Sequence, residues 1–423
     1  MLVWALVAVH QLSPEAIVLL GAGALFLVTV VSGLLDRVWL TEPLLATILG
    51  LVAGLFAVGR LDLESPLILT IFELTLALVL FSDASRIDVI RLRQGYNWPL
   101  LMLVVGTPIV IVLGAAVAGL ILGLVLGPAL LLGVILAPTD AALSEPVLES
   151  TSVPARVRQA LNVESGLNDG LAVPALLIAI GIIDANTAGG VGNGIALVAS
   201  QLGLGIVGGL VIGWLGALLL GKGIEAGWVN PLHQRISAVA FALAGYTAIQ
   251  LLGGSGFVAV FIAGGLMSHL IRPRANHLYE FAETEGHSLV LVAFFIFGAG
   301  PAARMLEGGV RMEAVVFACV SLLLLRPAAI ALSLLGNALH RRTVLFLGWF
   351  GPRGLATIVF VLVATEELGA IDPIVQDTVT VTVMLSIILH GVTAVPMSRW
   401  LAEMPMTEDM PEMGDAYPHP MRR

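Results

Sequence analysis

Charged residues are scarce in this chain: Asp, Glu, Lys and Arg make up 12% of its 423 residues, whereas 58% are hydrophobic. Globular domains usually carry about twice that share of charge. The composition therefore excludes an ordinary soluble protein and predicts an all-α polytopic membrane protein. Cysteine is nearly absent as well, and the single Cys319 excludes an intramolecular disulfide. The net charge of -9 gives no indication of a nucleic-acid partner.

Apolar stretches of about 17–25 residues indicate transmembrane helices, and the sequence contains thirteen of them. An odd number of spans places the two termini on opposite sides. If the N-terminus is outside, fifteen of the twenty basic residues fall inside and three fall outside. This predicts an external N-terminus and a cytoplasmic C-terminus in the cell membrane. The predicted spans are 14–34, 43–59, 66–84, 98–126, 127–145, 157–182, 193–221, 234–252, 254–271, 282–301, 312–337, 343–365 and 374–398.

No connection between spans is long enough for a soluble domain, so we expect one transmembrane domain over residues 1–400. The tail, residues 401–423, is short and rich in Met, Pro and acidic residues, a composition typical of disorder. A Gly203-x-Gly205-x-x-Gly208 motif matches the dinucleotide fingerprint, but it lies in the seventh span with no strand before it. Gly205, Gly209 and Gly213 recur every four residues, which we interpret as a site of close helix packing, and we expect no cofactor.

Two predicted spans are interrupted by proline or glycine near the middle of the membrane. The fifth contains Pro138-Thr139-Asp140, and the twelfth contains Gly351-Pro352-Arg353-Gly354. Proline removes a backbone donor, and a broken helix in a membrane is tolerated only where the exposed groups meet protein or a wet cavity. Paired interrupted helices in corresponding halves mark the substrate site of many transporters. We therefore expect an inverted repeat of helices 4–6 and 11–13, about residues 98–182 and 312–398, whose unwound helices cross.

Four polar residues stand together in the sixth span: Glu164, Ser165, Asn168 and Asp169. A charged side chain at the bilayer centre costs about 2.5–3.5 kcal/mol on insertion scales, so it indicates an ion or proton pathway. Residues four apart share a helix face. We expect the face with Ser165 and Asp169 to bind a cation and the face with Glu164 and Asn168 to hold structure.

Arginines inside the membrane provide partners for these acids. Where the two broken helices cross, Asp140 would compensate helix N-terminal dipoles and Arg353 would compensate C-terminal ones. We predict that Glu164 pairs with Arg353, with Arg326 in the eleventh span as the alternative partner. Otherwise Arg326 balances charge near the site. A guanidinium keeps its proton, so such a pair is a fixture and not a carrier.

Other titratable residues lie in or near spans. Glu73, in the middle of the third span, is interpreted equally as a cation ligand or as a carboxylate of a cavity wall. Asp83, near the inner end of that span, is interpreted as interfacial. His269, His287 and His390 lie near span ends, where an interfacial anchor is expected rather than a pH sensor.

The residues inside the membrane contain more acids than bases, which favours a cation over an anion. Oxygen ligands suit a small hard cation such as sodium, and no cluster of His and Cys in the sequence indicates a transition metal. A carboxyl group removed from water favours its neutral form, so H+ and Na+ can compete for Asp169. Because Asn168 cannot titrate, we expect electroneutral exchange of one cation for one proton.

Three segments of the chain resemble the monovalent cation/proton antiporters of the NhaP/NHE type. They are Ala137-Pro138-Thr139-Asp140, Glu164-Ser165-Gly166-Leu167-Asn168-Asp169-Gly170 and Gly351-Pro352-Arg353-Gly354. The resemblance implies a homodimer whose protomers each have a dimerisation part and a six-helix ion-transport part. It also implies elevator-like alternating access, no cofactor and no enzymatic activity.

The resemblance assigns roles to individual residues as well. Asp169 would be the essential ion- and proton-binding carboxylate, and Asn168 would mark the electroneutral branch. Glu164 and Arg353 would form the structural ion pair. The other residues expected around the bound Na+ are Asp140, Ser165, Thr139 through its carbonyl, and Glu73.

Exchange of Na+ or Li+ for H+ is the leading hypothesis, and K+ is the close alternative because it accepts the same oxygen ligands. A cation channel or a sodium-coupled solute symporter belongs to a different class. A channel usually has a repeated filter or rings of charge, and neither is seen in the sequence. An intramembrane aspartyl hydrolase with an Asp140–Asp169 dyad is opposed by the thirteen spans and by the adjacent Asn168.

Overall fold

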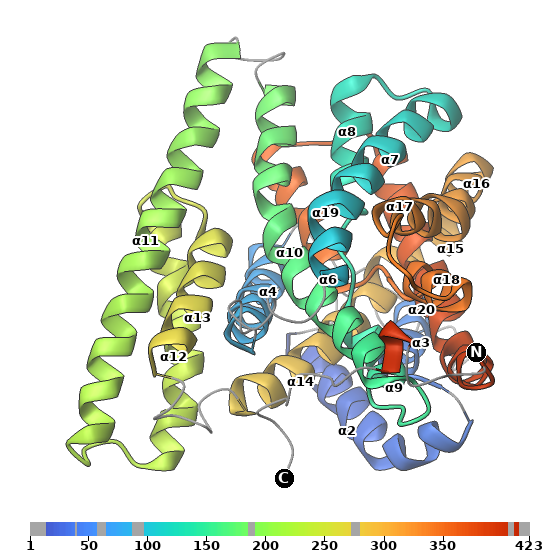
Figure 1. The fold of residues 1–423 in the computed structure, drawn as a ribbon. Coiled ribbons are helices and arrows are strands. Elements are labelled where there is room, and N and C mark those ends of the chain that lie inside the picture. The colour runs from blue at the N-terminus through green and yellow to red at the C-terminus, as the bar shows by residue number, and fades with distance from the viewer. Residues whose placement is uncertain are drawn as a thin grey trace, which may run out of the picture.

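The computed structural model describes residues 14–38, 40–56, 65–86, 97–184, 191–271, 280–404 and 410–413. Within these residues the chain is helical and contains no β-strand, and Figure 1 shows a bundle of long helices. Seven helices in the described part are long and apolar enough to cross a membrane by length and composition. The predicted fold class, an all-α polytopic membrane protein, is confirmed.

Each of the thirteen predicted spans corresponds to a helix or an interrupted helix of the described residues. Eight of them form α-helices without interruption: α2 (Pro14–Val38), α3 (Glu42–Phe56), α4 (Pro66–Arg86), α10 (Ala155–Asp184), α11 (Val191–Glu225), α12 (Pro231–Leu251), α13 (Gly256–Ile271) and α20 (Pro373–Ala402).

Three other spans contain a π-helical turn, a local widening that is frequent at functional sites in helices. The fourth span is α6 (Trp98–Leu101), η1 (Met102–Gly106) and α7 (Thr107–Leu122). The tenth is α14 (Glu280–Phe297), η3 (Gly298–Ala302) and α15 (Ala303–Gly308). The eleventh is α16 (Met312–Val320), η4 (Ser321–Leu325) and α17 (Arg326–Ser333).

The fifth and twelfth spans are interrupted where the sequence predicts. The fifth is α8 (Leu126–Ile135) and α9 (Ala141–Leu148), and the twelfth is α18 (Arg341–Trp349) and α19 (Leu355–Leu368). Pro138 and Pro352 lie in the two unwound segments, where they cannot donate a helical hydrogen bond. Each interrupted helix therefore stands second in a triplet of spans, as expected for the two repeats.

Helix α10 occupies the middle of the bundle (Figure 1). It packs against α4, α11 and α13, and also against α8, α9 and α19. Both interrupted helices thus contact the helix that carries Glu164 and Asp169. Since α10 contacts both sets of helices, its polar residues are enclosed by several elements and shielded from lipid.

The glycines of α11 lie where this helix packs against α13. A Cβ at Gly205 would lie 2.9 Å from the Ser255 carbonyl oxygen, and a Cβ at Gly209 would lie 2.6 Å from the Ala259 carbonyl oxygen. Such distances leave no room for a side chain. The row of glycines at Gly205, Gly209 and Gly213 is thus a packing surface against α13, as the sequence predicts.

Part of the acidic tail is ordered, contrary to the prediction of disorder. Residues Pro411–Met413 form the 3-10 turn η5, and the Glu412 side chain is buried. Its Oε1 accepts hydrogen bonds from the His340 backbone N–H and the Thr343 hydroxyl, both at 2.8 Å. These contacts give hydrogen-bond partners to the His340 N–H and the Thr343 hydroxyl at the start of α18. A prediction from composition alone cannot foresee such a cap.

Candidate ion-binding site

The two unwound segments, 136–140 and 350–354, meet directly. The backbone N–H of Asp140 donates to the carbonyl of Pro352 at 2.8 Å. This approach requires glycine: a Cβ at Gly354 would overlap the Asp140 carboxylate, and a Cβ at Gly351 would overlap the Arg326 guanidinium. The glycines on each side of Pro352-Arg353 therefore allow the crossing.

Asp140 caps two half-helices at once. Its Oδ1 accepts from the backbone N–H groups of Ala142 (2.8 Å) and Leu143 (3.3 Å) at the start of α9. Its Oδ2 accepts from the N–H of Leu355 (2.7 Å) at the start of α19. The first N–H groups of a helix lack partners within the helix, and a negative charge is favourable there. The geometry agrees with the expected compensation of N-terminal dipoles.

Arg353 serves the opposite helix ends. Its Nε donates to the carbonyl of Leu136 at 2.7 Å, just after α8, and its Nη1 donates to the carbonyl of Gly351, just after α18. The side chain is fully buried. The last carbonyls of a helix lack partners and carry partial negative charge, so this guanidinium compensates two C-terminal ends, as expected.

The prediction that Glu164 pairs with Arg353 is wrong, because Glu164 pairs with a different arginine. Arg326 occupies that place, with Nη1 and Nη2 each 3.0 Å from one carboxylate oxygen of Glu164. Two physical reasons account for the difference. The Arg353 guanidinium is engaged by carbonyls, and the absence of a side chain at Gly351 leaves space for Arg326. The alternative partner named from the sequence is therefore the one that pairs.

Further hydrogen bonds fix this face of α10. The Asn168 Nδ2 donates to Oε1 of Glu164 (3.3 Å) and to the carbonyl of Ala137 (3.2 Å). The Thr139 hydroxyl donates to Oε2 of Glu164 at 3.4 Å, and the Thr107 hydroxyl donates to Oδ1 of Asn168 at 3.3 Å. Glu164 and Asn168 thus tie α10 to the unwound segment 136–140, the structural task expected of them.

The other face of α10 contains an unsatisfied acid. The Ser165 hydroxyl donates to the carbonyl of Thr139 at 2.7 Å. Asp169 is 6% exposed, and its Oδ1 has no hydrogen-bond partner within the described residues. A buried carboxylate oxygen without a partner is costly. Carboxylate, hydroxyl and carbonyl oxygens from two elements therefore converge beside an acid that still lacks a ligand.

The carboxylate that the third span brings to this site is Asp83, not Glu73. Asp83 packs on α10, where a Cβ at Gly166 would lie 3.3 Å from its Cβ, and its charge acts on Asp169. Glu73 lies about 15 Å away along α4. Its neighbours are Tyr246 of α12 and, near the end of α19, Glu366 and Glu367.

The position of each carboxylate in the α4 sequence favoured Glu73, in the middle of the span, over Asp83, near its inner end. Only the packing of α4 on α10 selects Asp83. The structure thus brings together Asp140, Ser165, Asp169 and the Thr139 carbonyl from the predicted ligand set, and it does not bring Glu73 to them.

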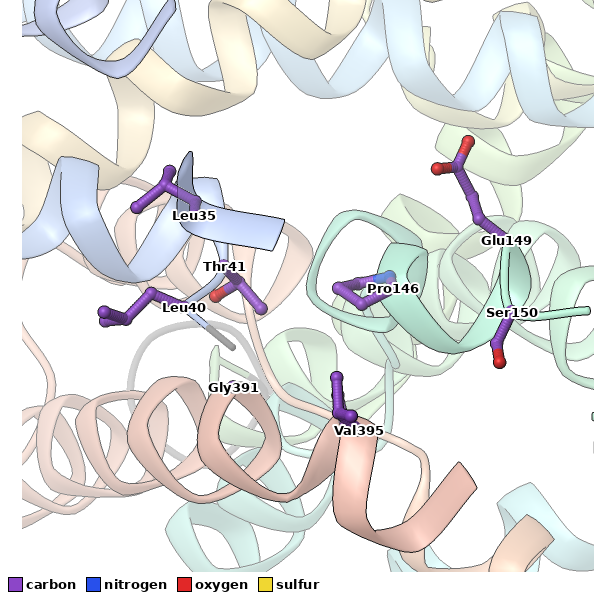
Figure 2. A pocket seen from close by; sticks show the side chains of 9 residues that line it. Leu35, Leu40, Thr41, Pro146, Glu149, Ser150, Gly391 and Val395 are labelled. Atoms are coloured by element: carbon purple, nitrogen blue, oxygen red, sulfur yellow. The ribbon is translucent and has the colours of Figure 1, made fainter. Parts of the chain in front are cut away.

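A half-open cavity of about 280 Å³ lies beside α9, near the junction of α2 and α3 and near α20 (Figure 2). In Figure 2, Thr41 faces Pro146 across the opening, and Glu149 lies just past the end of α9. Helix α9 begins just after Asp140, its N-cap residue, so it joins the lining of the cavity to the crossing. The lining residues are Leu35, Leu40, Thr41, Pro146, Glu149, Ser150, Gly391, Ala394 and Val395.

The transmembrane family called sodium/hydrogen exchanger matches residues 23–400, which is nearly the whole chain. The chain belongs to this family. The match includes both unwound segments and all of α10, so the described crossing lies inside the family's region.

Two curated relatives illustrate the similarity. The chain is 27% identical over 386 residues to the K(+)/H(+) antiporter NhaP of Alkalimonas amylolytica, covering 90% of this chain and 66% of the relative. It is 26% identical over 362 residues to the Na(+)/H(+) antiporter ApNhaP of Aphanothece halophytica, covering 83% and 67%. The chain thus spans about two thirds of the length of these exchangers.

The fold is also that of a solved structure. The sodium proton antiporter MjNhaP1 from Methanocaldococcus jannaschii, determined at pH 8, superposes with a TM-score of 0.74 at 20% identity. The superposition covers 90% of this chain and all of the other. At this identity the likeness establishes the architecture alone.

Proposed function

We propose that this protein is a secondary antiporter that exchanges Na+ or Li+ for H+ across the membrane. The observation that carries the proposal is the buried Oδ1 of Asp169, which lies beside the crossing of the two unwound helices and has no hydrogen-bond partner among the residues that the structure describes. A bound cation or a proton would satisfy that oxygen. Because either ligand does so and both cannot bind together, exchange follows from competition for one carboxylate.

The cation would be held by Asp169, Asp140, the Ser165 hydroxyl and the Thr139 carbonyl. Asp140 and Ser165 are already oriented by their hydrogen bonds, so the ligands are positioned before the ion arrives. Glu164 is held by Arg326, and Asn168 has no proton to exchange. One titrating carboxylate per cycle gives an electroneutral 1:1 exchange.

Transport would proceed by an elevator-like movement of one part against the other. The moving part would be the six helices at about 98–182 and 312–398, which contain the crossing. The cavity of Figure 2 lies between α9 and α20 of this part and the α2–α3 junction of the rest, a suitable place for an approach route. The chemistry requires no cofactor and no enzymatic step.

The assembly would be a homodimer in the cell membrane, with the N-terminus outside and the C-terminus in the cytoplasm. Helix α11 supports this arrangement, because only 11% of its most apolar window is buried within one chain. Exposed apolar side chains along it suit lipid or a second copy. The distribution of basic residues supports the orientation.

Potassium is a second candidate cation, because the relative from Alkalimonas amylolytica is named a K(+)/H(+) antiporter. The oxygen ligands accept either ion, so a transport measurement must decide. Proteoliposomes with an imposed pH gradient would be given Na+, Li+ or K+, with and without a membrane potential.

Dissipation of the pH gradient by Na+ or Li+ that does not respond to potential is the expected result. A response to K+ alone would keep the exchange and change the cation. A current driven by the cation without proton movement would contradict exchange and favour a channel or a symporter.

A further inference from the structure

The unwound segment 350–354 is fastened at both ends to one face of α20. The backbone N–H of Arg353 donates to the Ser386 hydroxyl oxygen at 2.6 Å. The carbonyl of Trp349, the last residue of α18, lies 2.9 Å from Nε2 of His390. Residues four apart share a helix face, so Ser386 and His390 hold the two ends of the break side by side.

These contacts form a single chain of hydrogen bonds. A carbonyl only accepts, so Nε2 of His390 must carry the proton donated to Trp349. In the neutral ring Nδ1 is then an acceptor, and the Ser386 hydroxyl lies 3.2 Å from it. The Ser386 carbonyl is 2.8 Å from Nδ1 and becomes a partner only if the ring gains a second proton. The neutral tautomer thus links Arg353, Ser386, His390 and Trp349.

The chain of hydrogen bonds is sealed from solvent. Ser386 is 0% exposed and His390 is 1% exposed. The prediction of His390 as an interfacial anchor is therefore wrong. Buried polar groups that lose their partner have no water to replace it, which makes a fully satisfied network rigid and costly to break. Rigidity at this place matters because the helix that ends at Trp349 has lost its own regular hydrogen bonds.

The fastened segment supplies the contacts that shape the ion-binding site. Between its two ends, Pro352 accepts from the Asp140 N–H at 2.8 Å. Two residues past the Ser386 contact, Leu355 donates to the Asp140 carboxylate at 2.7 Å. A shift of the Arg353 backbone would therefore displace the two partners that the twelfth span gives to Asp140, although no hydrogen bond joins Ser386 or His390 to Asp140.

We propose that Ser386 and His390 are positioning residues, which fix segment 350–354 against Asp140 and thereby set the affinity for the transported cation. The proposal rests on the proposed antiport function. The pair acts through the backbone at Trp349, Arg353 and Leu355, and it makes no contact with the cation.

The test compares variants of the full-length protein in proteoliposomes. Ser386→Ala and His390→Phe each cut the chain of hydrogen bonds, and His390→Gln keeps a donor and an acceptor. Ser398→Ala is the matched control: that serine is also buried on α20, but its hydroxyl is bonded to the Ala394 carbonyl of the same helix. The readouts are the apparent KM for the cation and the maximal rate per folded protein.

Each cutting variant should raise the apparent KM about tenfold, the change expected from one lost buried hydrogen bond. The double variant should be little worse than either single one, because both interrupt the same network. His390→Gln should recover most of the affinity, and Ser398→Ala should leave the KM unchanged. Cutting variants with unchanged KM and only a lower yield of folded protein would overturn the proposal.

Hydrogen exchange of the Arg353 amide separates this inference from the proposed function. In detergent, Ser386→Ala should speed exchange at that amide whether or not transport occurs, and Ser398→Ala should not. If both variants retain the protection of the unmodified chain, the fastening itself is contradicted. If the unmodified chain moves no cation, the proposed function fails and the role in cation affinity fails with it.

Discussion

The two polar faces of α10 are equally buried and differ in whether their hydrogen bonds are complete. On one face, Glu164 has a bidentate arginine partner, and Asn168 both donates and accepts. On the other, Ser165 is satisfied, but Asp169 has an oxygen without a partner in the described residues. The faces lie about 100° apart on one helix. The side chains of α10 on the first face all have partners and hold structure, whereas the unpaired Oδ1 of Asp169 on the second leaves a place for an ion.

Replacement of Asp169 should give the largest effect. Asp169→Asn keeps the size of the side chain and removes the group for which the cation and the proton compete, so exchange should fall to background in proteoliposomes. The melting temperature should stay level or rise, since a buried unpaired carboxylate is costly. Asp184→Asn, at the end of the same helix, is the control and should keep exchange. Normal exchange by Asp169→Asn would remove the basis for calling it the carrier.

Replacement of Glu164 should act on stability and not on selectivity. Glu164→Gln leaves Arg326 buried without its counter-charge, and removal of one partner from a buried pair costs about 3–5 kcal/mol. Thermal unfolding in detergent should show a lower melting temperature, while the order of cation preference stays the same. An unchanged melting temperature together with altered cation preference would mean that this face also selects the ion.

Replacement of Asn168 by an acid should weaken the structural face without making a second carrier. In Asn168→Asp the donor to Ala137 and Glu164 is lost, and an unsatisfied buried group costs about 1–3 kcal/mol. We expect reduced stability and exchange that still does not respond to membrane potential. The measurement is exchange with and without an imposed potential. Efficient potential-driven exchange would show that this one residue sets the stoichiometry.

The smallest effect is expected at Glu73. Glu73→Gln should leave the apparent KM for the cation nearly unchanged. The corresponding change in binding free energy should stay within about 0.5 kcal/mol, the range expected for a substitution away from the site. Asp83→Asn should change it more, because the Asp83 charge acts on Asp169. Transport kinetics of the two variants side by side provide the comparison. The reverse order would return Glu73 to the cation site.

Local sequence signals located most of the architecture. Apolar length located thirteen segments that are each a helix or an interrupted helix, and proline and glycine marked both interruptions, because these features act on each segment of backbone separately. The spacing of the polar residues on α10 separated its two faces for the same reason. The ordered tail was missed, because its burial depends on Glu412 meeting His340 and Thr343 at the start of α18.

The sequence by itself determined the membrane class, the positions of the helices and breaks, and the placement of Ser165 and Asp169 on the same face of α10. Tertiary structure alone decided that Arg326 and not Arg353 binds Glu164, that Asp83 packs on α10 at Gly166, and that His390 is buried against the twelfth span. The physical reason is distance along the chain. Glu164 and Arg326 are 162 residues apart, and no local periodicity specifies which remote side chain packing will bring to a buried charge.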